Sequence, residues 1–472
     1  MRASSIKLAT AASIAALILA SIPFIGFSVD MTDEKQGVMI DFAYYNVEWV
    51  ELDLDGLTGM GALESACSKK GYGIEYNEDG TVYSVGNVPQ LINVDWGMYI
   101  LEGVGKDTHW AEVEDPSSYD VSSQKIISWA RAGEGSAMMP AVDATGFTYY
   151  SYATEGKNRF GEDLRVATLA PSVAETVCAV GGLDNIIATD RYCDYPNRLV
   201  ERQNSGEVRL VGGFTDPNFE LIVAESPDLV FLDGGTGEHV TMADKLRKAG
   251  INCVVLHPAN SLNDFMMNLW VCASALGFPE NGNSYIKDAK EVINNICRIA
   301  DLSGKRVFLS LGISDSPYTP GPGTYVTNMI ESLGAENIFA DGTQSWFMVD
   351  REAVYDRQPD IIIIIYDAGE ISTPREYRAL LSGLNDMWKQ TPAFESGEVY
   401  VFSGDAASLL SRPGARIPES LELLAKIMDP ESFEAADPTD IVGVKYYNDS
   451  YNDPVDGYLT YVKAKGLLEW QR

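Results

Sequence analysis

One pattern occurs twice in this chain, and it constrains the fold more than any other feature. Residues 219–232 read FELIVAESPDLVFL, and residues 351–364 read REAVYDRQPDIIII. Each stretch carries a glutamate (Glu220 or Glu352), a proline seven residues later, then an aspartate and an apolar run. The two glutamates are 132 residues apart. A unit repeated at this separation indicates two regions of similar architecture.

Each copy predicts a short helix followed by a buried strand. Asn218 and Asp350, both favourable N-cap residues, stand one residue before the stretches. The proline ends each helix, and the apolar runs 228–232 and 360–365 are long enough for buried parallel strands. The glutamates then fall in the first helical turn, where the helix dipole favours a carboxylate by roughly 0.3–1 kcal/mol. Helix stabilisation alone is therefore one explanation for them.

Strand-like and helix-like segments alternate from residue 163 to about 430. The stretch 261–301 is predominantly helical, with a break expected around Pro279 to Gly282. This pattern predicts two α/β lobes joined by helix. Ligands of such sheets bind in the crevice at the strand ends, so the sequence predicts a cleft between the lobes.

Residues 31–157 have a different texture. They contain alternating strand-like runs, a helix closed by Gly71 and a hairpin with its turn at Asp79-Gly80. A tail rich in Gly, Ala and Thr, residues 132–157, is typical of a linker. We expect a small β-rich α+β domain ahead of the lobes.

The first 30 residues have the composition of an export segment. A short basic region precedes an uncharged, mainly apolar stretch from Leu8 to Val29, and its 22 residues suffice to span a bilayer of about 30 Å. A cleaved signal and a retained membrane anchor both remain open. An extracytoplasmic protein, at the cell surface or in a periplasm, is expected in either case.

Charge and composition exclude several functions. The net charge is −33, with 68 acidic and 35 basic residues, so the surface repels nucleic acid. Six cysteines and three histidines show no metal-binding spacing, and no nucleophile elbow or phosphate loop is present. We therefore expect neither an enzyme nor a resident metal or cofactor.

Several stretches resemble one known family, and they occur in its order. These are RVATLAPSVAETVCAVGGLDNIIATDRYCDYP (165–196), VGGFTDPNFELIVAESPDLVF (211–231), RVFLSLGISDSPYTPGPGTYVTNMIESLGAENIF (306–339) and WFMVDREAVYDRQPDIIII (346–364). Residues 163 to about 430 are similar to the substrate-binding proteins of cobalamin and ferric-siderophore ABC importers. The resemblance implies a two-lobed periplasmic-binding-protein fold with a helical inter-lobe connection.

The resemblance also implies roles for particular residues. Glu220 and Glu352 match the glutamates that dock such proteins, one per lobe, onto arginine-lined pockets of the permease subunits. Charge pairing of this kind steers encounter and sets orientation. The ligand-binding positions implied between the lobes are Ser172, Asp194, Tyr195, Phe214, Tyr318, Trp346, Asp405, Arg412 and Arg416.

The aromatic positions suit a large, flat ligand such as a corrin. A ferric catecholate, being a trianion, would need several arginines, and only Arg412 and Arg416 are evident amid acids. A corrinoid is therefore the first expectation, and a ferric siderophore or haem the alternative. A surface adhesion or envelope protein, and a metal-cofactor enzyme on a related two-lobed fold, are rivals of other classes.

Residues 31–157 resemble the small β-rich domain at the C-terminal end of transcobalamin and intrinsic factor. There the domain covers one face of the corrin, but a spacer role is equally open. Trp96 and Tyr99 are contact candidates that also suit the core of a sheet. We expect a monomer with this division of the chain: signal peptide or anchor 1–30, β-rich domain 31–157, lobe 1 158–280, inter-lobe connection 281–304, lobe 2 305–430 and C-terminal extension 431–472.

Overall fold

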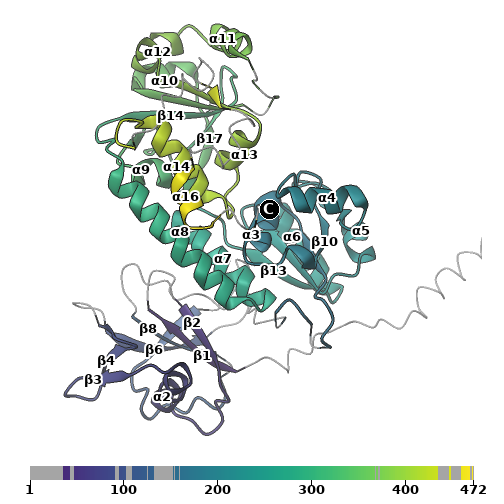
Figure 1. Cartoon of the computed structure of the whole chain (residues 1–472), viewed down its shortest axis with the longest axis vertical. Coiled ribbons are helices and arrows are strands. Elements are labelled where there is room, and N and C mark those ends of the chain that lie inside the picture. Colours follow the sequence, from purple (N-terminus) through teal and green to yellow (C-terminus); the bar gives the residue numbers. More distant parts are fainter. Residues whose placement is uncertain are drawn as a thin grey trace, which may run out of the picture.

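The computed structural model describes residues 36–42, 47–90, 95–102, 109–124, 126–131, 153, 155–158, 160–366, 368–369, 371, 373–433, 446–447, 459–467 and 470. Figure 1 shows a β-rich body at one end and two α/β bodies connected by a diagonal pair of long helices. The export segment expected over residues 1–30 and most of the expected linker 132–157 lie outside the described residues. None of the described helices is long and apolar enough to cross a membrane.

The N-terminal body is built on a mixed sheet in the order β2-β1-β8-β6-β7. Its strands are β1 (Gly37–Asp41), β2 (Val47–Glu51), β6 (Trp96–Glu102), β7 (His109–Val113) and β8 (Ile126–Arg131). β1 and β8 run parallel, and the other neighbours are antiparallel. Helix α2 (Gly59–Lys70) packs on one face, and Gly71 ends it with a φ of 73°. The buried Trp96 and Tyr99 belong to the sheet itself, as its core would require.

The predicted hairpin is present as a separate small sheet. Its strands are β3 (Ile74–Tyr76), β4 (Val82–Val85) and β5 (Val88–Pro89). β3 and β4 are antiparallel and enclose the turn at Gly80, whose φ of 87° suits glycine. This hairpin prediction is confirmed.

Lobe 1 is a parallel sheet in the order β11-β10-β9-β12-β13. Its strands are β9 (Val166–Thr168), β10 (Ile186–Thr189), β11 (Arg209–Leu210), β12 (Leu229–Asp233) and β13 (Asn252–Leu256). The intervening helices are α3 (Pro171–Ala179), η3 (Leu183–Asn185), α4 (Asn197–Ser205), α5 (Phe219–Ala224) and α6 (Gly237–Lys248). Alternation of strand and helix gives the parallel arrangement that the sequence predicts.

Lobe 2 has the order β17-β15-β14-β18-β19-β20, with β16 beside β14. Its strands are β14 (Arg306–Leu311), β15 (Tyr318–Pro320), β16 (Glu336–Asn337), β17 (Trp346–Met348), β18 (Ile361–Ile365), β19 (Val399–Phe402) and β20 (Tyr446–Tyr447). Its helices are α9 (Tyr325–Ser332), α10 (Arg351–Arg357), α11 (Pro374–Gly383), η4 (Trp388–Gln390), α12 (Pro392–Ser396), α13 (Asp405–Ser411) and α14 (Ile417–Met428). The central strands are parallel, and β15 and β17 add an antiparallel edge.

Helices α7 (Leu262–Leu276) and α8 (Pro279–Ile299) connect the lobes. The helix break lies at Gly277, with a φ of 76°, earlier than the expected Pro279 to Gly282. Pro279 instead begins α8, because a proline at the first helical position needs no N–H partner. The expected α/β fold of two lobes with a helical connection, preceded by a β-rich domain, is confirmed.

The second face of the N-terminal sheet packs against the rest of the protein. Met39 and Ile126 belong to the hydrophobic cluster that includes the cores of both lobes and α8. Asp41, two residues after Met39 and therefore on the same face, is fully buried and interacts electrostatically with Lys290 of α8. The N-terminal domain is thus seated on the helix that joins the lobes.

The described part of the C-terminal extension is also packed. Helix α16 (Thr460–Ala464) begins at the fully buried carboxylate of Glu422, which accepts the backbone N–H groups of Tyr461 and Val462 at 2.9 and 3.0 Å. Lys426 neutralises the same carboxylate at 2.7 Å. This charged cap fixes the extension to α14 of lobe 2.

Candidate functional site

Glu220 and Glu352 occupy equivalent places in the two lobes. Each lies in the first turn of a short helix, α5 or α10, two residues after its N-cap. Asn218 accepts the N–H of Leu221 at 3.1 Å, and Asp350 caps α10 in the same way. Both glutamate side chains are exposed. The two carboxylates are therefore held by the same local structure and remain accessible to a partner.

Exposed apolar side chains accompany the glutamates. Leu221, next to Glu220, is 48% exposed, and Met348, four residues before Glu352, is 61% exposed. Tyr318 of β15 is paired with Met348 of β17 and is itself 49% exposed. Tyr318 therefore lies on the surface of lobe 2, within the group of residues that precedes α10.

An aromatic residue stands six positions before each glutamate: Phe214 in lobe 1 and Trp346 in lobe 2. Both are half-buried and pack against the same large hydrophobic cluster. The ring of Phe214 meets that of His239 edge-on, with centroids 5.1 Å apart. This equal spacing was available in the sequence and extends the repeat beyond its helix and strand.

Arg416 forms the centre of a polar group at the start of α14. Its guanidinium donates to Asp405 at 2.7 Å, lies 3.5 Å from Glu419 and covers the ring of Tyr195 at 4.0 Å from the centroid. Only 3% of the Arg416 side chain is exposed. Two predicted residues of lobe 2, Arg416 and Asp405, thus pair with each other, and Arg416 contacts the predicted Tyr195 of lobe 1.

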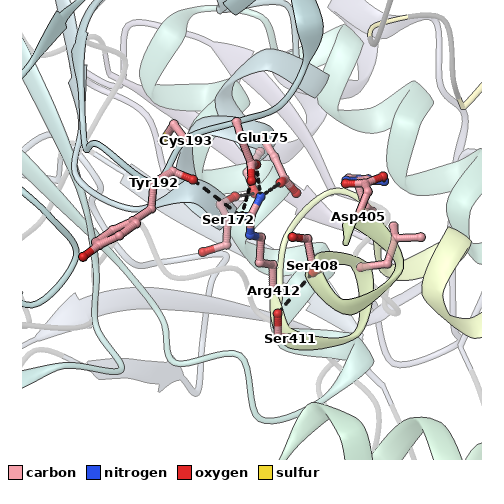
Figure 2. Close-up of polar contacts among 12 residues, drawn as sticks. Ser172, Glu175, Tyr192, Cys193, Asp405, Ser408, Ser411 and Arg412 are labelled. Atoms are coloured by element: carbon pink, nitrogen blue, oxygen red, sulfur yellow. Dashed lines mark hydrogen bonds and ion pairs between the residues drawn. The ribbon is translucent and has the colours of Figure 1, made fainter. Parts of the chain in front are cut away.

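Arg412 reaches across the lobes. Its Nη1 lies 3.2 Å from Oε1 of Glu175 in α3, and its Nη2 donates to Oδ2 of Asp194 at 3.0 Å. Figure 2 shows the guanidinium between Glu175 and the loop that carries Tyr192, whose carbonyl oxygen is 3.5 Å from Nη2. The predicted Arg412 and Asp194 are therefore in contact. Glu175 was not predicted from the sequence. It is the one charged residue within the mainly apolar segment SVAETVCAV, which would have indicated a buried carboxylate.

Burial shifts the titration of two acids in this group. Burial raises the pKa of Glu175 to about 7, against the opposing effect of Arg416 and Arg412. Burial likewise raises the pKa of Asp190 to about 6, opposed by the backbone N–H of Tyr192. The pKa of each carboxyl lies above its ordinary range, because burial penalises the charged form.

Ser172 lies where the loop between α13 and α14 of lobe 2 meets α3 of lobe 1. The loop between α13 and α14 approaches it so closely that a Cβ on Gly414 would lie 2.9 Å from the Ser172 carbonyl oxygen. A cavity of about 10 Å³ remains there, lined by Ser172, Val173, Thr176, Asp233, Leu256, His257, Ala259, Asn268 and Pro413. This volume holds about one water molecule. A larger ligand requires the surrounding contacts to change.

Trp470, from the C-terminal extension, meets Tyr195 edge-on with ring centroids 5.9 Å apart. Tyr195 is therefore covered on one side by Arg416 and flanked by Trp470. Nothing in the sequence around Trp470 indicated this contact, because the two residues are 275 positions apart.

Six predicted residues thus come together: Ser172, Asp194, Tyr195, Asp405, Arg412 and Arg416. Phe214 and Trp346 pack against the same large hydrophobic cluster, and Tyr318 lies at the surface. No group of three or more potential metal ligands is found within the described part of the chain. Two α/β lobes, two long helices that connect them and a polar contact at their junction define the class of two-lobed binding proteins.

The chain belongs to the periplasmic binding protein family, whose model matches residues 166–406. It is similar to an uncharacterized ABC transporter substrate-binding lipoprotein, YvrC, of Bacillus subtilis, with 24% identity over 58% of this chain and 82% of the relative. It is 29% identical to a vitamin B12-binding protein of Yersinia pestis over 42% of this chain and 69% of that protein. Among solved structures, the periplasmic vitamin B12 binding protein BtuF of Vibrio cholerae matches at 23% identity, covering 56% of this chain and 96% of its own, with a TM-score of 0.47.

Proposed function

We propose that this protein is the extracytoplasmic substrate-binding component of an ABC importer and carries a corrinoid of the cobalamin type between its lobes. One observation carries the proposal: Glu220 and Glu352 are exposed at the same turn of equivalent helices, one in each lobe. A permease with two related subunits offers two equivalent cationic pockets. A carrier with one anchor per lobe fits that arrangement, and charge pairing would orient it.

The related proteins support the same assignment. Their names include an ABC transporter substrate-binding lipoprotein and several vitamin B12-binding proteins. The segments around the two glutamates resemble docking motifs. The expected partner surface is therefore a pair of arginine-lined pockets on the permease. The protein then acts by binding and release, without a covalent step.

The charges of the site favour a neutral or weakly charged ligand. Arg412 is engaged by Glu175 and Asp194, and Arg416 by Asp405. Using either guanidinium for a trianionic ferric chelate would leave an acid unpaired. Half-buried aromatic residues suit a flat, partly apolar ligand, because they offer area at small entropic cost. We place Phe214 and Trp346 in contact with the ligand when the lobes accept it.

We also propose the division of the chain expected from the sequence, with the N-terminal domain as a fixed part of the carrier. Its contact with α8 through Met39 and Ile126 supports that role over a free spacer.

The test is a calorimetric titration of the purified full chain, accompanied by tryptophan fluorescence. Cyanocobalamin, dicyanocobinamide, a ferric hydroxamate and haemin are offered in turn. One-site submicromolar binding of a corrinoid is the expected result. Tight binding of haemin or the ferric hydroxamate alone would keep the carrier and reject the corrinoid. Binding of none would reject the proposed ligands and favour an adhesion or envelope role.

A further inference from the structure

An arginine of lobe 2 pairs with a buried glutamate of lobe 1. Arg412 follows α13, and its Nη1 lies 3.2 Å from Oε1 of Glu175 in α3. The exposed fractions of the two side chains are 16% and 1%. Asp194, from the loop after β10, accepts hydrogen bonds from both arms of the guanidinium, from Nη2 at 3.0 Å and also from Nη1, and is 62% exposed. Glu175 and most of Arg412 are therefore shielded from solvent, whereas Asp194 is exposed to it.

Arg412 hydrogen-bonds Glu175, whereas Arg416 acts on it through its charge. The charged groups that act on Glu175 are Arg416, Arg412 and Asp405. Arg416 is already held by Asp405 and lies beside Glu419, so its charge is largely offset. Removing the partner of a buried ion is costly, because the remaining charge has lost both water and its counter-ion.

The contact is also sterically close. The Arg412 loop carries Gly414, where a Cβ would lie 2.9 Å from the carbonyl oxygen of Ser172 and 3.1 Å from its Cα. The loop is therefore seated directly on the first turn of α3, one turn before Glu175. Separation of the lobes at this point would expose the Glu175 carboxylate and the guanidinium together.

We propose that Arg412 and Glu175 form a cross-lobe latch that sets how readily the cleft opens. The guanidinium neutralises a carboxylate that remains buried only while the lobes are in contact, and Asp194 orients the guanidinium from the solvent side. Arg412 and Glu175 are thus positioning residues for ligand capture. This inference rests on the proposed function only in taking the space between the lobes as the route of the ligand.

The latch predicts an unusual pattern of variants. Arg412→Gln leaves Glu175 without the cation that hydrogen-bonds it, so at a pH well above about 7, where the carboxylate stays ionised, the lobes separate to hydrate it. Glu175→Gln alone removes the charge that needs neutralising, and Arg412 keeps Asp194, so the lobes stay together. The double variant Arg412→Gln/Glu175→Gln is expected to return to the closed arrangement, because it removes both the buried carboxylate and the cation that neutralised it.

The measurement is the distance between spin labels in the full chain without ligand. Labels are placed at cysteines substituted for the exposed Glu201 in α4 and Arg378 in α11, in a Cys297→Ser background because the other five native cysteines are buried. In Arg412→Gln, the distribution of label-to-label distances is expected to shift to longer values by more than the width of the wild-type distribution. The double variant is expected to restore the wild-type distribution. Asp341→Asn, which breaks the Arg357–Asp341 pair within lobe 2, is the matched control.

An unchanged distance in Arg412→Gln, or a double variant as open as Arg412→Gln, would overturn the latch. If Arg412→Gln does not fold, Arg412→Lys serves instead, since a lysine cannot bridge both carboxylates as the guanidinium fork does. Partial opening that Glu175→Gln reverses is then the expected result, and no opening overturns the proposal. Because no ligand is present, failure of every titration of the proposed function would leave this result unaffected.

Discussion

The carboxylate of Asp360 accepts the backbone N–H of Arg306 at 2.9 Å, and the N–H of Asp360 donates to the Arg306 carbonyl oxygen at 2.8 Å. Asp228 and Arg165 form the same two bonds at the same distances in lobe 1. In each repeat, the aspartate after the proline fixes the start of a buried strand, β18 or β12, against the first strand of its lobe. The repeated sequence pattern therefore determines the register of the strand as well as the helix before it.

This relationship predicts a loss of stability in Asp360→Ala. The substitution leaves the partly buried N–H of Arg306 without its acceptor, which costs about 1–2 kcal/mol in the free energy of unfolding. Asp228→Ala is expected to cost less, because its bond to Arg165 is exposed. Urea unfolding measures both values. Asp386→Ala, at a side chain 92% exposed, is the control, and a loss in Asp360→Ala no larger than the control would contradict the assignment.

The sequence was informative wherever local signals agreed with the fold. N-caps, prolines and apolar runs located both copies of the repeat, because each signal acts within a few residues. The role of Asp228 was missed because its partner, Arg165, lies 63 residues away and only the folded sheet brings them together. The break before α8 was displaced for a different reason, since a proline that normally ends a helix also fits its first position.

Reversal of both anchors, Glu220→Lys with Glu352→Lys, is expected to abolish uptake of labelled cyanocobalamin by cells that express the importer. Lysines would face cationic pockets and repel them, while the cleft keeps its ligand affinity. Vesicle or whole-cell uptake and calorimetry on the purified chain separate the two effects. The control Glu201→Lys changes an exposed acid of α4 by the same charge.

Each single reversal is expected to reduce uptake, and the double reversal to abolish it. Intact uptake in the double variant would remove the docking role from both glutamates. Lost ligand affinity in the double variant would instead place the two residues in the binding site.

The cleft was only partly predictable. Ser172, Tyr195, Asp405, Arg412 and Arg416 come together because the lobes bring their loops to one place. Glu175 and Trp470 escaped prediction, since a helix period cannot show which face of α3 meets the other lobe, and Trp470 reaches Tyr195 only through the packing of the C-terminal extension.

Trp346→Ala is expected to weaken cyanocobalamin binding roughly tenfold or more, which corresponds to about 1.4 kcal/mol. The half-buried ring offers a rigid apolar surface that alanine cannot replace. Calorimetry gives the dissociation constant, and the urea midpoint shows whether folding is affected. Tyr83→Ala, at an exposed aromatic residue of the N-terminal domain, is the control. An unchanged dissociation constant in Trp346→Ala would exclude the ring from the ligand site.

The contact between the N-terminal domain and α8 predicts a pH effect at Lys290. Burial lowers the pKa of this lysine from 10.5 to about 8, with Asp41 acting in the opposite direction. Between these two values the unfolded chain holds more protons than the folded chain, so the stability of the wild type rises with pH. Lys290→Met also leaves the buried Asp41 without its lysine, which lowers stability, but its stability relative to the wild type is expected to be most favourable below pH 8 and to fall towards pH 10.5, as urea unfolding across this range would measure. Lys287→Met controls for the loss of a positive charge from the exposed side of α8. A difference between Lys290→Met and wild type that stays constant over the whole range would show that Lys290 does not titrate with folding, and would contradict its burial against the N-terminal sheet.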